Sequence, residues 1–417
     1  MKSVLYRREV ILMRKITVTE LKQVPLARQK IEIVERKGLG HPDYICDSIM
    51  NEISIALSQE YRRRFGEIIH HNIDKGLLVA GETEGRFGGG RIKRPMLLVF
   101  GDRATFKVNR DEVDVDRIAV ETAKNWFRTK LRFVDPERHV KYQVEIKPGS
   151  AELTDIFRRR KPEGEFLGAN DTSAAVGYAP LTPTERLVLE TERYLNSSDF
   201  KKSFPESGED IKVMALRHND HLELTISMAF VDRFIESESD YFAKKQAILD
   251  ALERFVEAKA AFNNVHIDFN TLDVKGRGLS GIYTTVTGTS AEDADSGQVG
   301  RGNRVNGIIP LNRPSSSEAA AGKNPVSHVG KIYNLLSFKI ADRIHREVPG
   351  IDEAYVWLLS KIGIPIDQPA IASAQLILSD TTRMEEVSTR TRDIIDDELS
   401  KMNDFCRELA EGKVPVC

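Results

Sequence analysis

The sequence predicts an α+β fold of three similar lobes in a pseudo-threefold arrangement, each lobe a mostly antiparallel sheet with helices on one face. Its 417 residues are too many for one simple core, so two or three domains are the starting expectation. Strand-like and helical segments follow one another in three successive units. We expect a lead-in at residues 1–28 and lobes at 29–165, 166–290 and 291–417 that exchange segments.

The first unit opens with a strand, a glycine-rich turn and a long helix. Within that helix Ile45, Ile49, Ile53 and Leu57 recur every four positions, on one helical face. Pro42 fits the first helical position, where its missing N–H leaves no hydrogen bond unmade. The expected elements of this unit, with a mobile glycine-rich loop after the second strand, are strands at 30–34, 77–80, 96–100 and 140–146 and helices at 42–64 and 114–130.

The second unit begins with a helix whose start is marked by a capping box, formed by Thr182 and Glu185 around Pro183. A hairpin follows, with its turn at residues 218–220. The further elements of this unit are a helix at 240–262 and strands at 265–269 and 282–286. The third unit is expected to hold a helix at 329–346, strands at 355–359 and 375–378, and a closing helix of roughly 25 residues.

The composition is that of an ordinary globular protein. A formal charge of -2 gives no reason to expect binding to nucleic acid or to an acidic membrane. Cys46, Cys406 and Cys417 are too far apart for a disulfide framework or a zinc site, which favours reduced thiols and a cytoplasmic location. No run approaches the ~18 apolar residues of a membrane span, and the charged start is unlike a signal peptide. Met13 is an alternative natural start, which would make residues 1–12 an extension.

The stretch KGLGHPD, residues 37–43, places a histidine and an aspartate at the start of the first helix. Helix starts attract anions because their N–H groups are unpaired and the helix dipole is positive there. His41 can donate to an oxygen that gains negative charge, and Asp43 can hold Mg²⁺. The alternative is that Asp43 only favours the dipole and His41 is incidental.

Two further stretches combine acids, glycines and cations. In residues 168–180, Asp171 stands among small residues, where it would contact a ribose or an amine, or else form an Asx turn. Residues 287–314 carry Asp295 and then, between glycines, Arg301 and Arg304. Acids followed by glycines and arginines suit a metal-bound polyphosphate, because backbone comes close at glycine and guanidinium groups grip oxygens. A disordered polar loop is the alternative there.

A fourth stretch, residues 315–334, leads through Lys323 to His328, Lys331 and a helix start. It is not a phosphate-binding loop of the G-x-x-x-x-G-K-[ST] type. Asp210 and Lys212 add a carboxylate and a cation on a strand, where a solvated lysine is the alternative. Together these residues indicate an enzyme that handles a magnesium-bound polyphosphate. A small-molecule kinase, a nucleotide-binding regulator and a structural interaction protein are the rival interpretations.

From about residue 29 to its end, the chain resembles the archaeal branch of the S-adenosylmethionine synthetases, or methionine adenosyltransferases. The resemblance lies in GHPD, NDTSAAVGYAP, GEDIKVMALR, TGTSAEDADSGQVGRGNRVNG and AAAGKNPVSHVGKIYN. It implies three α+β lobes and a homodimer, or a tetramer, with active sites between subunits. It also implies ATP and L-methionine as substrates and Mg²⁺ as cofactor. In this family the methionine sulfur attacks C5′ of ATP and displaces triphosphate, which is hydrolysed to pyrophosphate and phosphate before release.

The resemblance also implies roles for individual residues. His41 meets the oxygen that bridges C5′ and the α-phosphate, and Asp43 holds Mg²⁺. The cations that complete the catalytic set are Lys212, Arg301 and Lys323. The substrate-binding residues are Asp171, Asp210, Asp295, Arg304, His328, Lys331 and Ser150.

The chain departs from the bacterial pattern at several positions. Tyr44 stands where bacterial members have a lysine, so a cation must come from elsewhere in the chain. Gly302 stands in place of a second lysine, for which Arg304 substitutes. Beyond Lys323 the chain is two residues longer than the bacterial pattern. His328 and Lys331 are the candidates for the second phosphate-binding lysine of that pattern. The carboxylate that binds a second magnesium ion is not placed. Residues 70–75 lack the glutamate that binds potassium in bacterial members, so a potassium requirement is left open.

Overall fold

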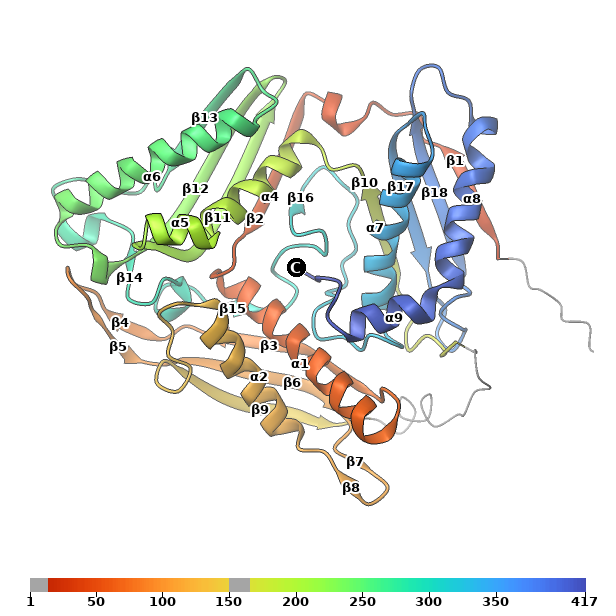
Figure 1. The fold of residues 1–417 in the computed structure, drawn as a ribbon, viewed down its shortest axis with the longest axis horizontal. Coiled ribbons are helices and arrows are strands. Elements are labelled where there is room, and N and C mark those ends of the chain that lie inside the picture. Colours follow the sequence, from red (N-terminus) through yellow and green to blue (C-terminus); the bar gives the residue numbers. More distant parts are fainter. Residues whose placement is uncertain (1–13, 150–165) are drawn as a thin grey trace, which may run out of the picture.

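The computed structural model describes residues 14–149 and 166–417, which form three sheets with helices packed on them (Figure 1). All three sheets are dominated by antiparallel pairs, and each also has a parallel pair that includes an edge strand. The α+β class and its three sheet-and-helix layers are confirmed.

Sheet A is built from the two ends of the chain and one strand of its middle. Its strands run in the order β1 (Ile16–Glu20), β18 (Ile371–Leu378), β17 (Ile351–Leu359) and β10 (Ala174–Ala179). Its helices are α7 (Val329–Glu347), α8 (Met384–Ser400) and α9 (Met402–Ala410). The closing helix expected from the sequence is therefore two helices, which meet at Lys401.

Sheet B holds the predicted hairpin at its centre. Its order is β13 (Asn264–Phe269), β12 (His221–Val231), β11 (Ser207–His218), β2 (Ile31–Lys37) and β16 (Ile309–Pro310), with β14 (Thr284–Thr285) beside β12. Its helices are α4 (Pro183–Leu195), α5 (Ser198–Ser203) and α6 (Glu238–Lys259). The capping box at the start of α4 is confirmed, because Thr182 accepts the N–H of Glu185 and the Glu185 side chain accepts that of Thr182.

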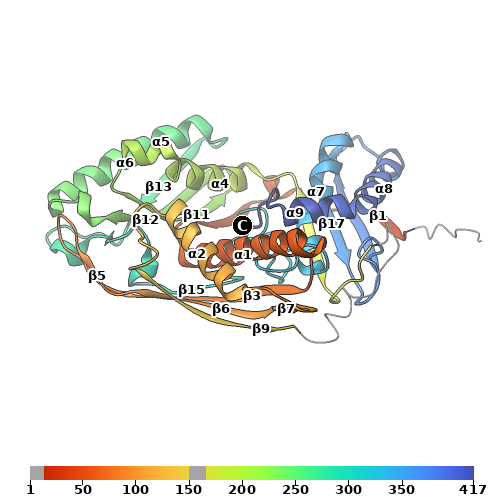
Figure 2. The same cartoon turned by 60° about the horizontal axis from the view of Figure 1, so that its bottom comes forward.

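Among the described residues, sheet C has helices on one face only, and we call its other face the open face. It comprises β15 (Gly297–Gln298), β3 (His71–Val79), β6 (Met96–Ala104) and β9 (Val140–Pro148), covered on one side by α1 (Pro42–Phe65) and α2 (Val115–Lys130) (Figure 2). The smaller elements are the hairpins β4 (Glu82–Glu84) with β5 (Arg91–Arg94) and β7 (Lys107–Val108) with β8 (Asp111–Glu112), and the 3₁₀ turns Leu26–Arg28, Asp232–Phe234, Gly278–Gly281 and Ser290–Glu292.

Several predicted elements differ from those observed. The strand expected at 282–286 shrinks to β14, and β1 and β10 had no counterpart in the prediction. The glycine-rich loop expected to be mobile forms the β4–β5 hairpin instead. It is anchored because the N–H of Gly90 donates to Asp232 at 2.8 Å and Phe87 packs on the core of sheet B.

Strands that are far apart in the sequence pair with each other throughout the molecule. β2 pairs with β11, β10 with β17, and β15 with β3. One apolar core joins sheets A and C through α1 and α7, while sheet B has a separate core with α4 and α6. We therefore define the lobes below by their sheets.

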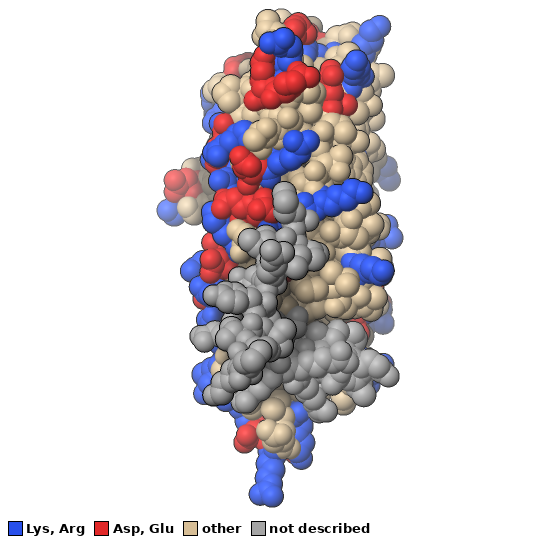
Figure 3. Space-filling view, turned by 90° about the vertical axis from the view of Figure 1, so that its right-hand side faces the viewer, with Lys and Arg blue, Asp and Glu red and all other residues tan. Residues whose placement is uncertain are grey.

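The surface matches the balanced charge of the sequence. On the face turned to the viewer in Figure 3, Lys and Arg lie interspersed with Asp and Glu. Within residues 14–149 and 166–417, the helices lack an apolar stretch of the length that a bilayer crossing needs.

Candidate functional site

The glycine turn before α1 lies against the backbone of β11. The N–H of Gly38 donates to Ile211 O at 2.7 Å, and that of Gly40 donates to Glu209 O at 2.9 Å. A Cβ on Gly40 would lie 2.5 Å from the nitrogen of Asp210, so only glycine permits this approach. The turn thereby holds the start of α1 beside the strand that carries Asp210 and Lys212.

His41 is the N-cap of α1, and its ring has a defined hydrogen-bonding role. Its Nδ1 accepts the N–H of Asp43 at 3.2 Å. A neutral imidazole that accepts through Nδ1 carries its proton on Nε2. The second nitrogen is then a donor, and His41 lines two adjoining cavities of the site. The helix-capping role that the sequence suggested for this region belongs to His41 itself.

Asp43 lies in the first turn of α1 and is held from two sides. Its Oδ1 accepts the N–H of Gln298 at 2.9 Å, and its Oδ2 pairs with Lys37 Nζ at 2.9 Å. Lys37 also donates to Arg301 O at 2.6 Å. This bond ties the loop between β15 and β16, residues 299–308 and here called the arginine loop, to the helix start. Lys37 thus places a cation at the start of α1, where the chain has Tyr44.

Asp210 and Lys212 both lie on β11 but differ in burial. Asp210 is buried, its Oδ2 accepts the N–H of Ser290 at 2.8 Å, and burial raises its pKa. The ammonium of Lys212 is partly exposed and lies 3.2 Å from Glu35 Oε1. A buried carboxylate and a partly exposed cation therefore line the same cavity.

Three adjoining cavities form one continuous trough. The first, of about 420 Å³, is lined among others by His41, Asp210, Lys212, Asn270, Leu272, Tyr283 and Asp295. The second, of about 460 Å³, shares His41, Lys212 and Asp295 with it and adds Lys37, Asp43, Gln298 and Arg301. The third, of about 770 Å³, shares Gln298 and Arg301 with the second and adds Asp74, Lys75, Glu318 and Lys323. Seven of the predicted site residues meet here: His41, Asp43, Asp210, Lys212, Asp295, Arg301 and Lys323.

Outside these cavities lie four other predicted residues that the structure describes: His328, Lys331, Asp171 and Arg304. His328 caps α7, where its Nδ1 accepts the N–H of Gly330, and burial lowers its pKa to about 3. Lys331 is buried and donates to Asn51 at 2.8 Å, with its pKa lowered by burial to about 7. Asp171 precedes β10, and its carboxylate accepts the N–H of the next residue, Thr172, at 2.7 Å. This contact differs from the Asx turn that the sequence offered as an alternative, in which the side chain bonds the backbone two residues on. Ser150 falls outside the described residues.

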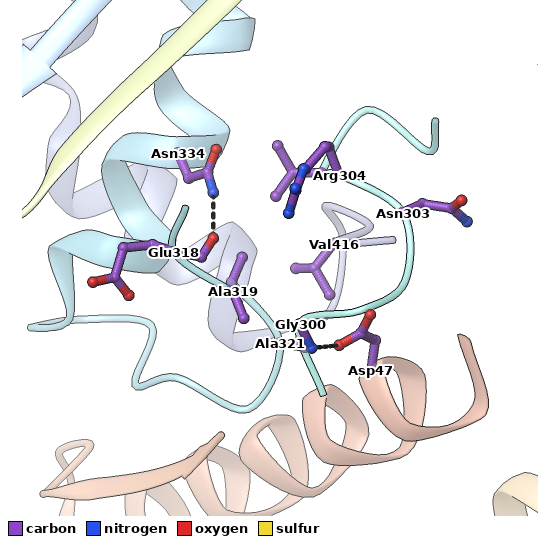
Figure 4. Close-up of a pocket in the computed structure, with 11 residues that line it drawn as sticks. Asp47, Gly300, Asn303, Arg304, Glu318, Ala319, Ala321, Asn334 and Val416 are labelled. Atoms are coloured by element: carbon purple, nitrogen blue, oxygen red, sulfur yellow. Dashed lines mark hydrogen bonds between the residues drawn. The ribbon is translucent and has the colours of Figure 1, made fainter. Parts of the chain in front are cut away.

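Arg304 lines a separate small cavity behind the arginine loop (Figure 4). This cavity of about 20 Å³ is large enough for roughly one water molecule. Across it, Asn334 donates to Glu318 O at 3.1 Å, and the N–H of Gly300 donates to Asp47 at 2.8 Å (Figure 4). Arg304 therefore faces the inside of the molecule and not the trough.

Sequence reasoning missed several residues that line the trough. Lys37 opens the glycine stretch, Asp74 and Lys75 belong to β3, and Tyr283 follows the turn GLSG. Of these residues, only Lys37 could have been predicted from the sequence to line the site, because it lies six residues before Asp43 in the same glycine-rich stretch. The others reach the site through sheet pairing and have no local motif.

No set of three or more metal-ligating side chains occurs among residues 14–149 and 166–417. Mg²⁺ commonly binds through one or two carboxylates together with substrate phosphates. Asp43, at the wall of the middle cavity and flanked by cations, has the oxygen donors for this mode of binding. The protein by itself does not form a closed metal cage within the described residues.

The fold and the trough together define an α+β protein whose trough has an excess of carboxylates at one end and an excess of cations at the other. This arrangement is typical of an enzyme whose ligand combines a polyphosphate with an organic group. A family model, S-adenosylmethionine synthetase (AdoMet synthetase), matches residues 14–413. The chain belongs to this family.

Relatives support the assignment over nearly the whole chain. The chain is 46% identical over 405 residues to a probable S-adenosylmethionine synthase of Aquifex aeolicus, covering 97% of this chain and all 100% of that protein. It is 45% identical to the S-adenosylmethionine synthase of Pyrococcus furiosus, covering 97% and 99%, and 48% identical to that of Methanothrix thermoacetophila, covering 92% and 94%.

A solved structure, described as an unusual S-adenosylmethionine synthetase from Campylobacter jejuni, has a similar fold. The TM-score is 0.56 at 16% identity, and the match covers 91% of this chain and 93% of that one. At this identity the likeness supports the fold alone. The family members are enzymes, and they need a divalent metal.

Proposed function

We propose that this chain makes S-adenosylmethionine from ATP and L-methionine in the trough. The methionine sulfur attacks C5′ of ATP, the C5′–O bond breaks, and triphosphate leaves; it is then hydrolysed to pyrophosphate and phosphate before release. The observation that carries the proposal is the order of charges along the trough. Carboxylates outnumber cations in the lining of the first cavity, the two are equal in the second, and cations outnumber carboxylates in the third. His41 lies at the junction of the first and second cavities.

This order matches the charges of the reaction. The leaving triphosphate carries about four negative charges and the product is a sulfonium, so cations and carboxylates are needed at opposite ends. Arg301 and Lys323 line the cavities suited to the phosphates. His41 Nε2–H can donate to the bridging oxygen as the C5′–O bond breaks, because Nδ1 is occupied by the Asp43 amide.

The first cavity suits adenosine and methionine. Tyr283 offers an aromatic face, and Asp210 and Asp295 offer carboxylates for the sulfonium, the methionine amine or the ribose. Lys212 lies between this cavity and the next, within reach of the first phosphate. We assign Asp210 and Asp295 to substrate binding and Lys212 to the departing phosphates.

For the divalent metal we propose Mg²⁺, held by Asp43 together with phosphate oxygens. When bound, the ion neutralises charge on the triphosphate. We assign no potassium ion to residues 70–75, because the carboxylate there, Asp74, already pairs with Lys323 at 2.6 Å and with Lys75 at 2.5 Å.

We also propose that two copies form a dimer in the cytoplasm with active sites between subunits; a tetramer is the alternative assembly. Asp171 supports shared sites, because it belongs to the family motif yet lines no cavity of the trough in its own chain. Leu77 and Val79, exposed on the open face of sheet C, offer apolar surface next to the trough.

An end-point assay with ATP, L-methionine and Mg²⁺ tests the function, with products read by mass spectrometry and phosphorus NMR. We expect S-adenosylmethionine with equal amounts of pyrophosphate and phosphate, all dependent on methionine. ADP as product would favour a small-molecule kinase, and ATP returned unchanged would favour a nucleotide-binding regulator. Either result would overturn the proposal.

A further inference from the structure

The third cavity of the trough holds a cation that no motif of the sequence indicated. Lys75 lines it together with Arg301 and Lys323. Its ammonium lies 2.5 Å from Asp74 Oδ1, whose other oxygen lies 2.6 Å from Lys323 Nζ. One carboxylate therefore holds two ammonium groups at the same cavity.

A β-bulge explains how two adjacent residues of β3 serve the same cavity. The register between β3 and β6 shifts between Asn72 and Lys75. Ile73 and Asp74 are both buried in succession, whereas from Lys75 onward exposed and buried residues alternate. Bulges of this kind occur next to functional sites, where they re-aim a side chain. Here the bulge turns Lys75 to the open face of sheet C and keeps Asp74 beneath it.

The residue opposite Lys75 leaves its side chain room to move. Its partner on β6 is Gly101, and a Cβ there would lie 2.9 Å from Lys75 O. The Lys75 side chain is 65% exposed, while those of Asp74 and Lys323 are 6% and 5% exposed. Lys323 is thus fixed in the wall, and Lys75 is the cation that can swing toward a ligand.

The wall around Lys323 is itself tied to β3. The N–H of Ile73 donates to Gly322 O at 2.8 Å, and Ser54 Oγ donates to Lys323 O at 3.0 Å. Gly322 has φ of 75°, and a Cβ there would lie 2.0 Å from Ile73 O, so this contact requires glycine. The two lysines therefore keep a defined separation through the backbone.

Both lysines of the third cavity have carboxylate partners when no ligand is bound. The Nζ of Lys323 lies 2.6 Å from a carboxylate oxygen of Asp74 and 3.2 Å from one of Glu318. The Nζ of Lys75 lies 3.6 Å from an oxygen of Asp102. A polyphosphate that enters would compete with Asp74 and Asp102 for the ammonium of Lys75. Phosphate oxygens form strong charge-assisted bonds, and the long, exposed lysine side chain can turn toward them.

We propose that Lys75 is a further phosphate-binding residue, which grips the end of the triphosphate farthest from His41. The proposal rests on the proposed function of the trough. Lys75 takes the role of the second phosphate-binding lysine, for which His328 and Lys331 were the candidates, because neither of those two lines the trough. The ligand class is a linear polyphosphate with its divalent metal.

The test is calorimetric binding of magnesium tripolyphosphate to the full chain. We expect Lys75→Met and Lys75→Gln to weaken binding about tenfold or more, the loss of one charge-assisted contact. The matched control is Lys141→Met, an exposed lysine on β9 of the same sheet outside the trough, which should stay within about twofold of the parent. Affinity for L-methionine should not change in any of the three.

Tripolyphosphate affinity within about twofold of the parent in both Lys75 variants would overturn the assignment, as would an equal loss in Lys141→Met. Because Lys75 is exposed, melting temperatures near that of the parent are expected and should be checked. Binding needs no turnover, so a parent protein that binds tripolyphosphate but makes no S-adenosylmethionine would sink the proposed function and leave the role of Lys75 to be judged by these affinities.

Discussion

At the scale of single residues, the site depends on which atoms are already engaged. His41 has one ring nitrogen bound to the backbone and the other available, and Asp43 has one oxygen bound to an amide and the other to a lysine. These contacts orient both side chains before any ligand arrives, and preorganised groups of this kind are usually the largest contribution to catalysis.

Replacing His41 by Asn tests its part in breaking the C5′–O bond. Asparagine is a good N-cap, so the helix start should persist while the Nε2 donor is lost. We expect turnover to fall at least about 10²-fold with little change in melting temperature. His221→Asn, at an exposed hairpin position, is the control and should keep its turnover. Near-normal turnover in His41→Asn would remove this residue from the mechanism.

Replacing Asp43 by Asn tests its assignment as the magnesium ligand. The amide keeps an acceptor for Gln298 but loses the charge that a divalent cation needs. We expect the Mg²⁺ concentration for half-maximal activity to rise by about tenfold or more. Asp293→Asn, an exposed residue that bonds Thr83, serves as the control. A magnesium titration unchanged from that of the parent would count against Asp43 as a ligand.

At the scale of elements, α1 organises the site through its contacts with the loop that follows β15. Asp43 and Asp47, one turn apart, accept the N–H groups of Gln298 and Gly300. Gly297 fits there because a Cβ would lie 2.1 Å from Pro42 O. The arginine loop is therefore bonded along the first two turns of α1, which fixes Arg301 over the helix start.

The burial of Asp47 on α1 should make the stability of the fold depend on pH. Burial raises the pKa of Asp47 to about 7, from about 3.9 in an unfolded chain. Because the pKa is higher in the folded state, Asp47 contributes most to the free energy of unfolding below about pH 4, where it is protonated in both states. This contribution is lost as the pH rises through about 7. The melting temperature of Asp47→Asn, relative to that of the parent, should therefore increase between pH 5 and pH 8.

Thermal unfolding of the ligand-free protein in a chelator checks this prediction. Asp116→Asn, at an exposed position in the first turn of α2, should keep a constant offset from the parent over the same range. An Asp47→Asn offset that stays flat, or that moves the other way, would contradict the assigned direction of the pKa shift.

At the scale of the whole molecule, the three sheets bring distant loops to one trough. Lys37 ends β2 of sheet B, Lys75 lies on β3 of sheet C, and Arg301 follows β15. The trough therefore exists only when sheets B and C are joined. Asp171, at the edge of sheet A, remains outside it in the single chain.

The position of Asp171 predicts that two inactive variants restore activity together. If each site combines His41 of one copy with Asp171 of the other, His41→Asn and Asp171→Ala should each be nearly inactive alone. Co-expressed in equal amounts, they should recover about a quarter of the parent activity, since half of the dimers are mixed and each of these has one intact site. Activity no higher than that of the single variants would place Asp171 in its own subunit or outside the site.

Sequence periodicity and motifs anticipated much of the local structure. The four-residue repeat of Ile45, Ile49 and Ile53 marked the buried face of α1, and the capping box at Thr182 appeared as expected. These features depend on residues within a turn of each other, so a linear pattern contains them. The same holds for His41 and Asp43, whose roles at a helix start follow from their place beside Pro42.

Tertiary structure alone decided which charges meet. The bond from Gln298 to Asp43 spans 255 positions and that from Lys323 to Asp74 spans 249. Such contacts depend on sheet pairing and on a β-bulge, which packing of the two cores sets and no local pattern encodes. For that reason the sequence placed Arg304 and Lys331 beside Arg301 and Lys323, whereas the fold turns both inward and brings Lys37 and Lys75 to the trough instead.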